Sequence, residues 1–284
     1  MWYLKKIPKI LHLYWGNEKL SFLRFISITS FLNYNPDWEI RLYVPAVLGR
    51  PPTWKSHEYQ QEYTGINYFD CLKLLPIKII EVDFCGFQLD NSMPEVHKSD
   101  FLRWHVLQTA GGVYADTDIL YFYSLEYLSF NTKENQDMNS CFCLNEKWAD
   151  PHSIGFLMSV PDNEIFHGLK NNCFEKYDPS NYQGWGSAIL NKAYPTWSVF
   201  QKSFPNNVLF NLPMDVFYSY GEDVLAMYNG SKKTYYTDRS LGLHWYGGHP
   251  RTREFENLFS PENMDSFSGA INFAVQKAVQ RRYF

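Results

Sequence analysis

The chain has 284 residues, of which 45% are hydrophobic and 20% charged, a composition typical of a globular protein with one large or two small domains. Its net charge of −4 argues against a nucleic-acid-binding protein. The sequence contains no apolar run of about 18 residues, so we expect no membrane span. Five cysteines without zinc-site spacing, and an N-terminus without the pattern of a signal peptide, favour reduced thiols and a cytoplasmic protein.

The first part of the chain predicts alternating strands and helices. An apolar strand over 9–14 ends at Trp15, a helix covers 20–33, and strands cover 39–44 and 78–83, with an irregular helical insertion at 45–77. This order predicts a Rossmann-like α/β sheet with helices on both sides. Because open α/β sheets bind ligands at the carboxyl ends of their strands, Trp15 is a candidate platform for a nucleobase, with a core tryptophan as the alternative. The sequence has no glycine-rich phosphate loop, so a bound phosphate would need another partner, such as a metal ion.

A helix that ends at two glycines follows. Pro94 precedes a helical pattern, and Gly111 or Gly112 ends it, since a left-handed cap position suits glycine. Asp100 and Arg103 share one face of this helix because they are three residues apart. The alternative to a role in a site is a surface ion pair worth under about 0.5 kcal/mol.

Two carboxylates come next, in what the sequence predicts to be one extended run over 113–123. In such a strand Asp116 and Asp118 point to the same side, roughly 6.5–7 Å apart along the chain, and Thr117 faces away. Two hard oxygen donors on one side suit Mg²⁺ or Mn²⁺, which complete their coordination with water and substrate phosphates. The alternative for an isolated pair is a solvated turn at a strand end.

Signals beyond residue 125 are weaker. The sequence predicts a polar loop or short helix at 125–136, a strand at 153–159, a helix at 164–176, and a Gly/aromatic turn at 181–187 before a helix at 188–193. The stretch 242–249 contains two histidines, His244 and His249, and an imidazole is a ligand that suits Mn²⁺. The alternative is a structural histidine. The basic tail that ends at 277–282 is expected to be an exposed helix, with a membrane-surface contact as the alternative.

The run formed by Ser99–Asp100, Arg103, Gly111–Gly112, Tyr114 and Asp116–Thr117–Asp118 resembles the DXD-containing sugar-binding family of glycosyltransferases. That family includes yeast cell-wall α-1,6-mannosyltransferases and bacterial capsule or lipopolysaccharide sugar transferases, and it is related to the catalytic domains of large clostridial glucosylating toxins. The opening stretch 7–16 is similar to the family's first strand, and weaker similarity continues to about Trp245. The family usually has a Gly-Pro turn near 183–186; proline is absent here, which favours an ordinary turn over substrate contacts at Gln183 and Trp185.

The resemblance implies a single GT-A domain, with a nucleotide-sugar-binding half at 1–124, an acceptor-side half at 125–250 and a helical tail at 251–284. It implies a metal-dependent, retaining transfer of a hexose from a nucleotide-diphosphate sugar to a glycan, lipid-linked or protein-linked sugar acceptor. The alternatives are a haloacid-dehalogenase-like phosphatase, whose Asp-x-Asp pair follows the first strand, and a non-catalytic nucleotide-sugar-binding module.

The resemblance also implies roles for individual residues. Asp118 would bind Mn²⁺ or Mg²⁺ directly, Asp116 would bind it through water or contact the ribose and sugar, and His244 would complete the site. Asp100 and Arg103 would contact the sugar and phosphate, and Ser99 and Tyr114 the nucleotide. Trp15 matches the tryptophan that stacks on uracil in the toxin relatives, which favours a UDP-sugar over GDP-mannose.

Overall fold

A computed structural model describes residues 6–16, 18–51, 63–128, 138–175, 178, 180–221, 223–228 and 236–280. Its central feature is a seven-stranded sheet in the order β3-β2-β1-β4-β7-β6-β8. The strands are β1 (Ile10–Tyr14), β2 (Glu39–Pro45), β3 (Lys78–Val82), β4 (Gly112–Ala115), β6 (Ser140–Leu144), β7 (His152–Ser159) and β8 (Leu209–Asn211). Strands β3, β2, β1 and β4 are parallel, β7 is antiparallel to both β4 and β6, and β8 is parallel to β6.

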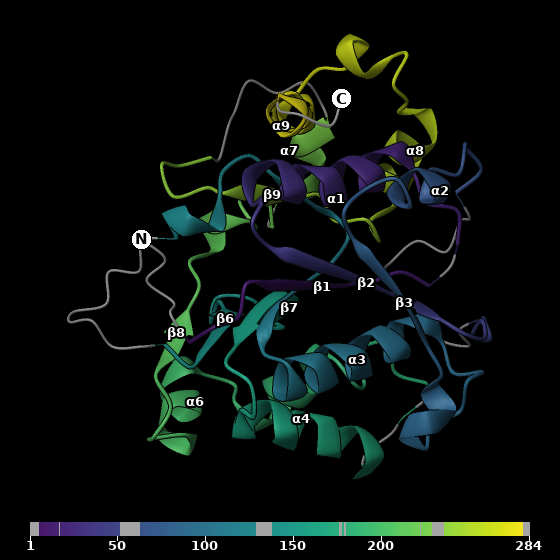
Figure 1. Ribbon diagram of the computed structural model, residues 1–284. Helices are drawn as coiled ribbons and strands as arrows, with labels where there is room; N and C mark the ends of the chain where they lie inside the picture. The colour runs from purple at the N-terminus through teal and green to yellow at the C-terminus, as the bar shows by residue number, and fades with distance from the viewer. Residues whose placement is uncertain are drawn as a thin grey trace.

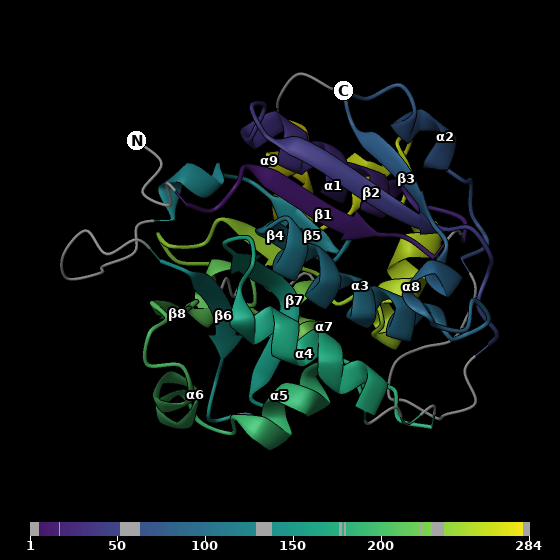
Figure 2. The ribbon, with the colours of Figure 1, turned by 60° about the horizontal axis from the view of Figure 1, so that its bottom comes forward.

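Helices cover both faces of this sheet (Figure 1). One face carries α1 (Phe22–Tyr34), α2 (Phe69–Leu72), α8 (Pro250–Leu258) and α9 (Ala270–Val279), and the other carries α3 (Glu95–Thr109) and α4 (Glu164–Glu175). The shorter helices are α5 (Ser187–Ala193), α6 (Trp197–Ser203), α7 (Val224–Tyr228) and the 3₁₀ turns Phe84–Phe87, Leu125–Tyr127, Met214–Val216 and Met264–Ser266. Figure 2 shows α4 and α5 on the same side of the sheet. The predicted α/β class, a Rossmann-like sheet with helices on both sides, is confirmed.

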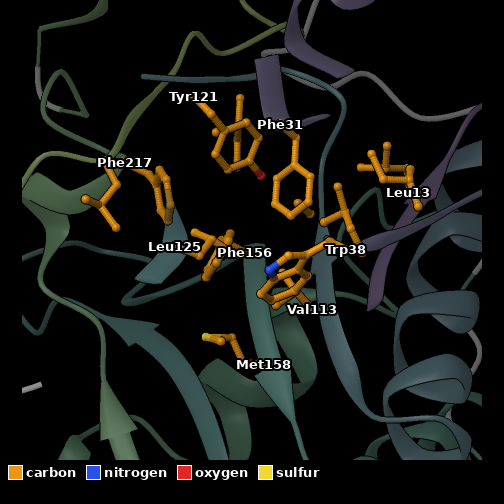
Figure 3. Packing of buried hydrophobic residues seen from close by; sticks show 14 of the residues in the cluster. Leu13, Phe31, Trp38, Val113, Tyr121, Leu125, Phe156, Met158 and Phe217 are labelled. Atoms are coloured by element: carbon orange, nitrogen blue, oxygen red, sulfur yellow. The ribbon is translucent and has the colours of Figure 1, made fainter. Parts of the chain in front are cut away.

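Aromatic and aliphatic side chains fill the space between α1 and the sheet (Figure 3). Phe31 of α1 is fully buried and meets Trp38 and Tyr121 edge-on, with ring centroids 5.4 and 5.0 Å apart. Phe156 of β7 packs on Phe217 at 4.5 Å. Burial of rings such as these contributes on the order of 2 kcal/mol each, so this packing holds α1 against the face of the sheet.

The expected single extended run over 113–123 is wrong, because the chain changes sheets within it. Strand β4 belongs to the large sheet, whereas β5 (Ile119–Tyr121) pairs antiparallel with β9 (Gly242–His244) in a separate two-stranded sheet. The backbone changes partners on the way: Asp116 N donates to Gly155 O at 2.9 Å, and Trp245 N donates to Asp118 O at 2.9 Å. This crossing places the carboxylate pair beside β9.

The C-terminal tail is not the exposed helix that its charges suggested. In α9 the side chains of Ala270, Ile271, Ala274, Val275 and Ala278 are buried. Asn33 Nδ2 of α1 donates to Ala278 O at 3.1 Å, so the helix docks on the core through its apolar face. Residues 281–284, the end of the basic tail, lie outside the described residues, as do 52–62 of the predicted insertion and 129–137 of the predicted loop. Among the helices in the described ranges, not one combines the length and apolar character needed to cross a bilayer.

Candidate active site

Two carboxylates and an imidazole meet where β4 leads into β5 and β9 ends. One ligand atom from each of Asp116, Asp118 and His244 lies within 4.8 Å of the others. Asp118 Oδ2 accepts from Gly247 N at 2.7 Å, while its Oδ1 is buried, faces His244 Nε2 at 3.2 Å and receives no well-aligned hydrogen bond from any described residue. Asp118 Oδ1 is thus a buried oxygen without a well-aligned hydrogen bond from the described residues, close to two other potential metal ligands, an arrangement that fits a divalent cation. Two carboxylate oxygens and one imidazole nitrogen suit Mn²⁺.

Asp118 is held in its charged form. Burial favours the neutral carboxyl, but His244, Arg24 and the Gly247 N–H outweigh it and hold the pKa of Asp118 below its ordinary value. The side chain of Asp116 is 34% exposed and reaches the neighbouring cavities. Asp118 is therefore the better placed of the two for direct coordination.

A cavity of about 530 Å³ opens beside these ligands and extends to the end of β1. Its wall includes both Trp15 and Asp118. Trp15 is 8% exposed, its Nε1 donates to Glu18 O at 2.8 Å, and the guanidinium of Arg24 lies 4.9 Å from its ring. The two side chains on which a nucleotide-sugar site would depend thus border one space.

Asp100 and Arg103 share a helix face as predicted, but they are not a surface pair. They are 2% and 4% exposed, and Arg103 Nη2 lies 3.1 Å from Asp100 Oδ1 and 3.4 Å from Asp116 Oδ1. Arg103 Nη1 donates to Ile154 O at 2.6 Å, and its guanidinium covers the ring of Tyr114 at 4.7 Å. The arginine therefore links the helix to the carboxylate pair.

The remaining predicted residues divide into those on the cavity wall and those behind it. Ser99 lines the cavity, and its Oγ shares a hydrogen bond of 2.7 Å with the hydroxyl of Tyr114, which is 1% exposed and lies behind the wall. His249 also lines the cavity, but its Nδ1 accepts from Arg251 N at 3.2 Å and caps α8, so His244 is the histidine beside the carboxylates. Trp185 is a core residue, 2% exposed.

A buried ion cluster behind the site was not predicted from the sequence. Arg24 lies between the rings of Trp15 and Trp245, 4.9 Å from each, and its Nη1 donates to Thr117 Oγ1 at 2.7 Å. Glu256, fully buried on α8, lies 3.2 Å from Arg24 Nε and 3.1 Å from Arg253 Nη1. The sequence offers one local sign of this cluster, which is the lone arginine, Arg24, among the apolar residues of α1. Its carboxylate partner, Glu256, lies at the other end of the chain, so no local pattern pairs the two residues.

Comparison with known proteins finds similarity to glycosyltransferases. No curated protein sequence matches the chain significantly. Among solved structures, the PaToxG glycosyltransferase is 15% identical over 70% of this chain and 75% of its own, with a TM-score of 0.47. The galactosyltransferase LgtC, solved with donor and acceptor sugar analogues, is 14% identical over 90% and 99%, with a TM-score of 0.40. GlyE of Streptococcus pneumoniae TIGR4 is 10% identical over 96% and 61%, with a TM-score of 0.45. These likenesses are remote and assign no substrate.

The family model described as the glycosyltransferase sugar-binding region containing a DXD motif matches residues 26–142. This range includes Asp100, Arg103, Asp116 and Asp118, four of the residues gathered at the site. Through residues 26–142, the chain matches the DXD-containing family of glycosyltransferases.

Proposed function

We propose that the protein is a metal-dependent, retaining glycosyltransferase that moves a hexose from a nucleotide-diphosphate sugar to a glycan or glycoconjugate acceptor. The observation that carries the proposal is the 530 Å³ cavity whose wall includes Trp15 at one end and Asp116, Asp118 and His244 at the other. Trp15 matches the tryptophan that stacks on uracil in the toxin relatives, and we therefore expect the donor to be a UDP-sugar. GDP-mannose is the alternative donor.

The chain's own groups would divide the work. Asp118 and His244, with Asp116, would hold Mn²⁺ or Mg²⁺, which neutralises charge on the leaving diphosphate. Arg103 would contact the sugar and phosphate through the fixed fork of its guanidinium, which its contacts with Asp100 and Asp116 hold in place. Ser99 would donate to the nucleotide from the cavity wall, with Tyr114 behind it.

Retention is expected to follow a front-face path. The bond from the anomeric carbon to the phosphate oxygen breaks, the acceptor hydroxyl forms the new bond on the same face, and its proton passes to the departing phosphate oxygen. Residues 1–124 would bind the nucleotide sugar and 125–250 the acceptor, with His244 reaching back to the donor. All five cysteines are free, which supports a reducing, cytoplasmic location.

The test uses purified protein, Mn²⁺ and a panel of UDP- and GDP-hexoses, with release of the nucleoside diphosphate as the readout. One donor should be consumed, and Asp118→Asn should reduce the rate by a factor on the order of 100 or more. Asp70→Asn is the matched control, since Asp70 is 83% exposed and does not line the cavity. Full activity in excess chelator would contradict the proposal. Release of inorganic phosphate from phosphate esters would favour the phosphatase alternative. Binding of a donor without turnover would favour the non-catalytic binding module.

A further inference from the structure

A second cavity, of about 270 Å³, adjoins the first on the side of β7 and α5. The two cavities share the side chains of Arg103, Asp116, Tyr182, His244 and Tyr246 in their walls. A molecule in the second cavity would therefore meet the reacting end of a sugar donor held in the first. The first cavity is the one assigned above to the donor, so any role of the second cavity in transfer rests on that proposed function.

Tyr246 stands at the junction of the two cavities in an unusual backbone conformation. Its φ is +53°, in the left-handed region that non-glycine residues rarely adopt, and this turn aims the next backbone N–H, that of Gly247, at Asp118. Its ring meets His244 edge-on at 4.5 Å. Its hydroxyl is buried and has no hydrogen-bond partner among the described residues. An unsatisfied buried hydroxyl beside a cavity is a polar group that a bound molecule would satisfy.

Trp148 forms the neighbouring wall of the second cavity. Its side chain is half-buried, and a Cβ built on Gly221 would lie 2.5 Å from Trp148 Cζ2 and 3.0 Å from Tyr246 Oη. Only glycine at 221 leaves room for both rings in this arrangement. A flat aromatic surface beside a hydroxyl is the combination that recognises the apolar face and the polar rim of a sugar ring.

The charges of the second cavity restrict what can enter. Its described lining contains three carboxylates, those of Asp100, Asp116 and Asp150, and one guanidinium, that of Arg103. Arg103 already lies 3.1 Å from Asp100 and 3.4 Å from Asp116, so its charge is balanced within the protein. The cation proposed at Asp116, Asp118 and His244 would be offset by the diphosphate of the bound donor. A phosphate or carboxylate on the incoming molecule would therefore still face net negative charge at close range.

We propose that the second cavity binds an acceptor sugar ring that carries no anionic group, stacked on Trp148 and hydrogen-bonded by the hydroxyl of Tyr246. Trp148 and Tyr246 are binding and positioning residues in this arrangement. They orient the acceptor hydroxyl toward the donor, and the carboxylates of the lining exclude uronic acids and sugar phosphates.

The first experiment measures transfer and donor hydrolysis side by side. The acceptors are neutral methyl hexosides and the matching methyl uronides, which differ in one carboxylate. Neutral rings should be used at least about tenfold better than their uronic counterparts. Trp148→Ala should lower transfer about tenfold more than it lowers hydrolysis, and Tyr246→Phe should raise the KM for the acceptor more than that for the donor. Trp197→Ala, a half-buried tryptophan outside both cavities, should change neither rate.

The second experiment reverses one charge. Asp150→Lys places a cation in the second cavity and should raise the use of methyl uronides relative to methyl hexosides by about tenfold, whereas Asp70→Lys, at an exposed site, should not. Equal use of neutral and anionic acceptors by both variants and by the unmodified protein would overturn the inference while leaving the donor site intact. Absence of both hydrolysis and transfer in the unmodified protein would overturn the inference together with the proposed function.

Discussion

The buried ion cluster of Glu256 with Arg24 and Arg253 yields the sharpest stability prediction. Glu256 is fully buried, and the two arginine side chains are each 11% exposed, at 3.2 and 3.1 Å from its carboxylate oxygens. Glu256→Gln keeps the volume and the acceptor for Ser21 Oγ, which donates to Glu256 Oε1 at 2.7 Å, but leaves two guanidinium groups without their carboxylate. Removing one partner of a buried ion pair costs about 3–5 kcal/mol.

That loss corresponds to a fall in Tm of about 5–8 °C, because the entropy of unfolding is about 2.1 cal/mol/K per residue over 284 residues. The assay is thermal unfolding, backed by denaturant titration at neutral pH. The matched control is Glu254→Gln on the same helix, since Glu254 and its partner Arg251 are 58% and 53% exposed and such a pair contributes at most about 1 kcal/mol. Equal Tm shifts in the two variants would refute the reasoning, because the buried carboxylate with two arginine partners should matter far more than the exposed one with a single partner.

Three further predictions concern the proposed metal site and the sheet. Gly155→Ala would place a Cβ 2.9 Å from Asp116 Oδ2 and should abolish the Mn²⁺-dependent rise in Tm, whereas Gly86→Ala, with open space around the new atom, should leave it unchanged. Asp118→Asn should remove the same Mn²⁺ effect, which for the unmodified protein is about 2.7 kcal/mol when the metal concentration is 100 times its Kd; an unaltered effect in either variant would place the metal elsewhere. Burial lowers the pKa of His12 from 6.5 to about 4, so the folded state binds its proton less readily than the unfolded chain. Stability from this histidine is complete above pH 6.5 and falls by about 3 kcal/mol as the pH drops to 4, and His12→Gln should flatten that part of the pH profile in denaturant unfolding.

Local patterns in the sequence predicted much of the first half of the fold. The apolar run that ends at Trp15, the alternation in β2 and the left-handed cap at Gly111, whose φ is +64°, each follow from the conformational needs of a few adjacent residues. Strand β6 was missed because Ser140–Leu144 is short and buried on both faces, so it shows no alternation to detect.

The carboxylate pair depends on contacts that no local pattern predicts. Asp116 and Asp118 do converge, but not because they alternate along one strand. They converge because the chain passes from β4 to β5 between them and hydrogen-bonds first to Gly155 and then to Trp245. The residues around the pair give no sign that the backbone changes its hydrogen-bond partner there, because the two partners, Gly155 on β7 and Trp245 after β9, are far away in the sequence.

From its sequence alone, this protein is an α/β chain with a candidate ligand motif confined to the stretch 99–118, together with a histidine that suits the same metal. Tertiary structure alone decided that His244 rather than His249 joins the carboxylates, that Asp100 and Arg103 are buried, and that Arg24 is held by Glu256 behind the site. The physical reason is the distance along the chain over which each kind of interaction acts. Backbone preferences and periodicity act over a few residues, whereas ligand geometry and charge burial depend on contacts between segments far apart in the chain.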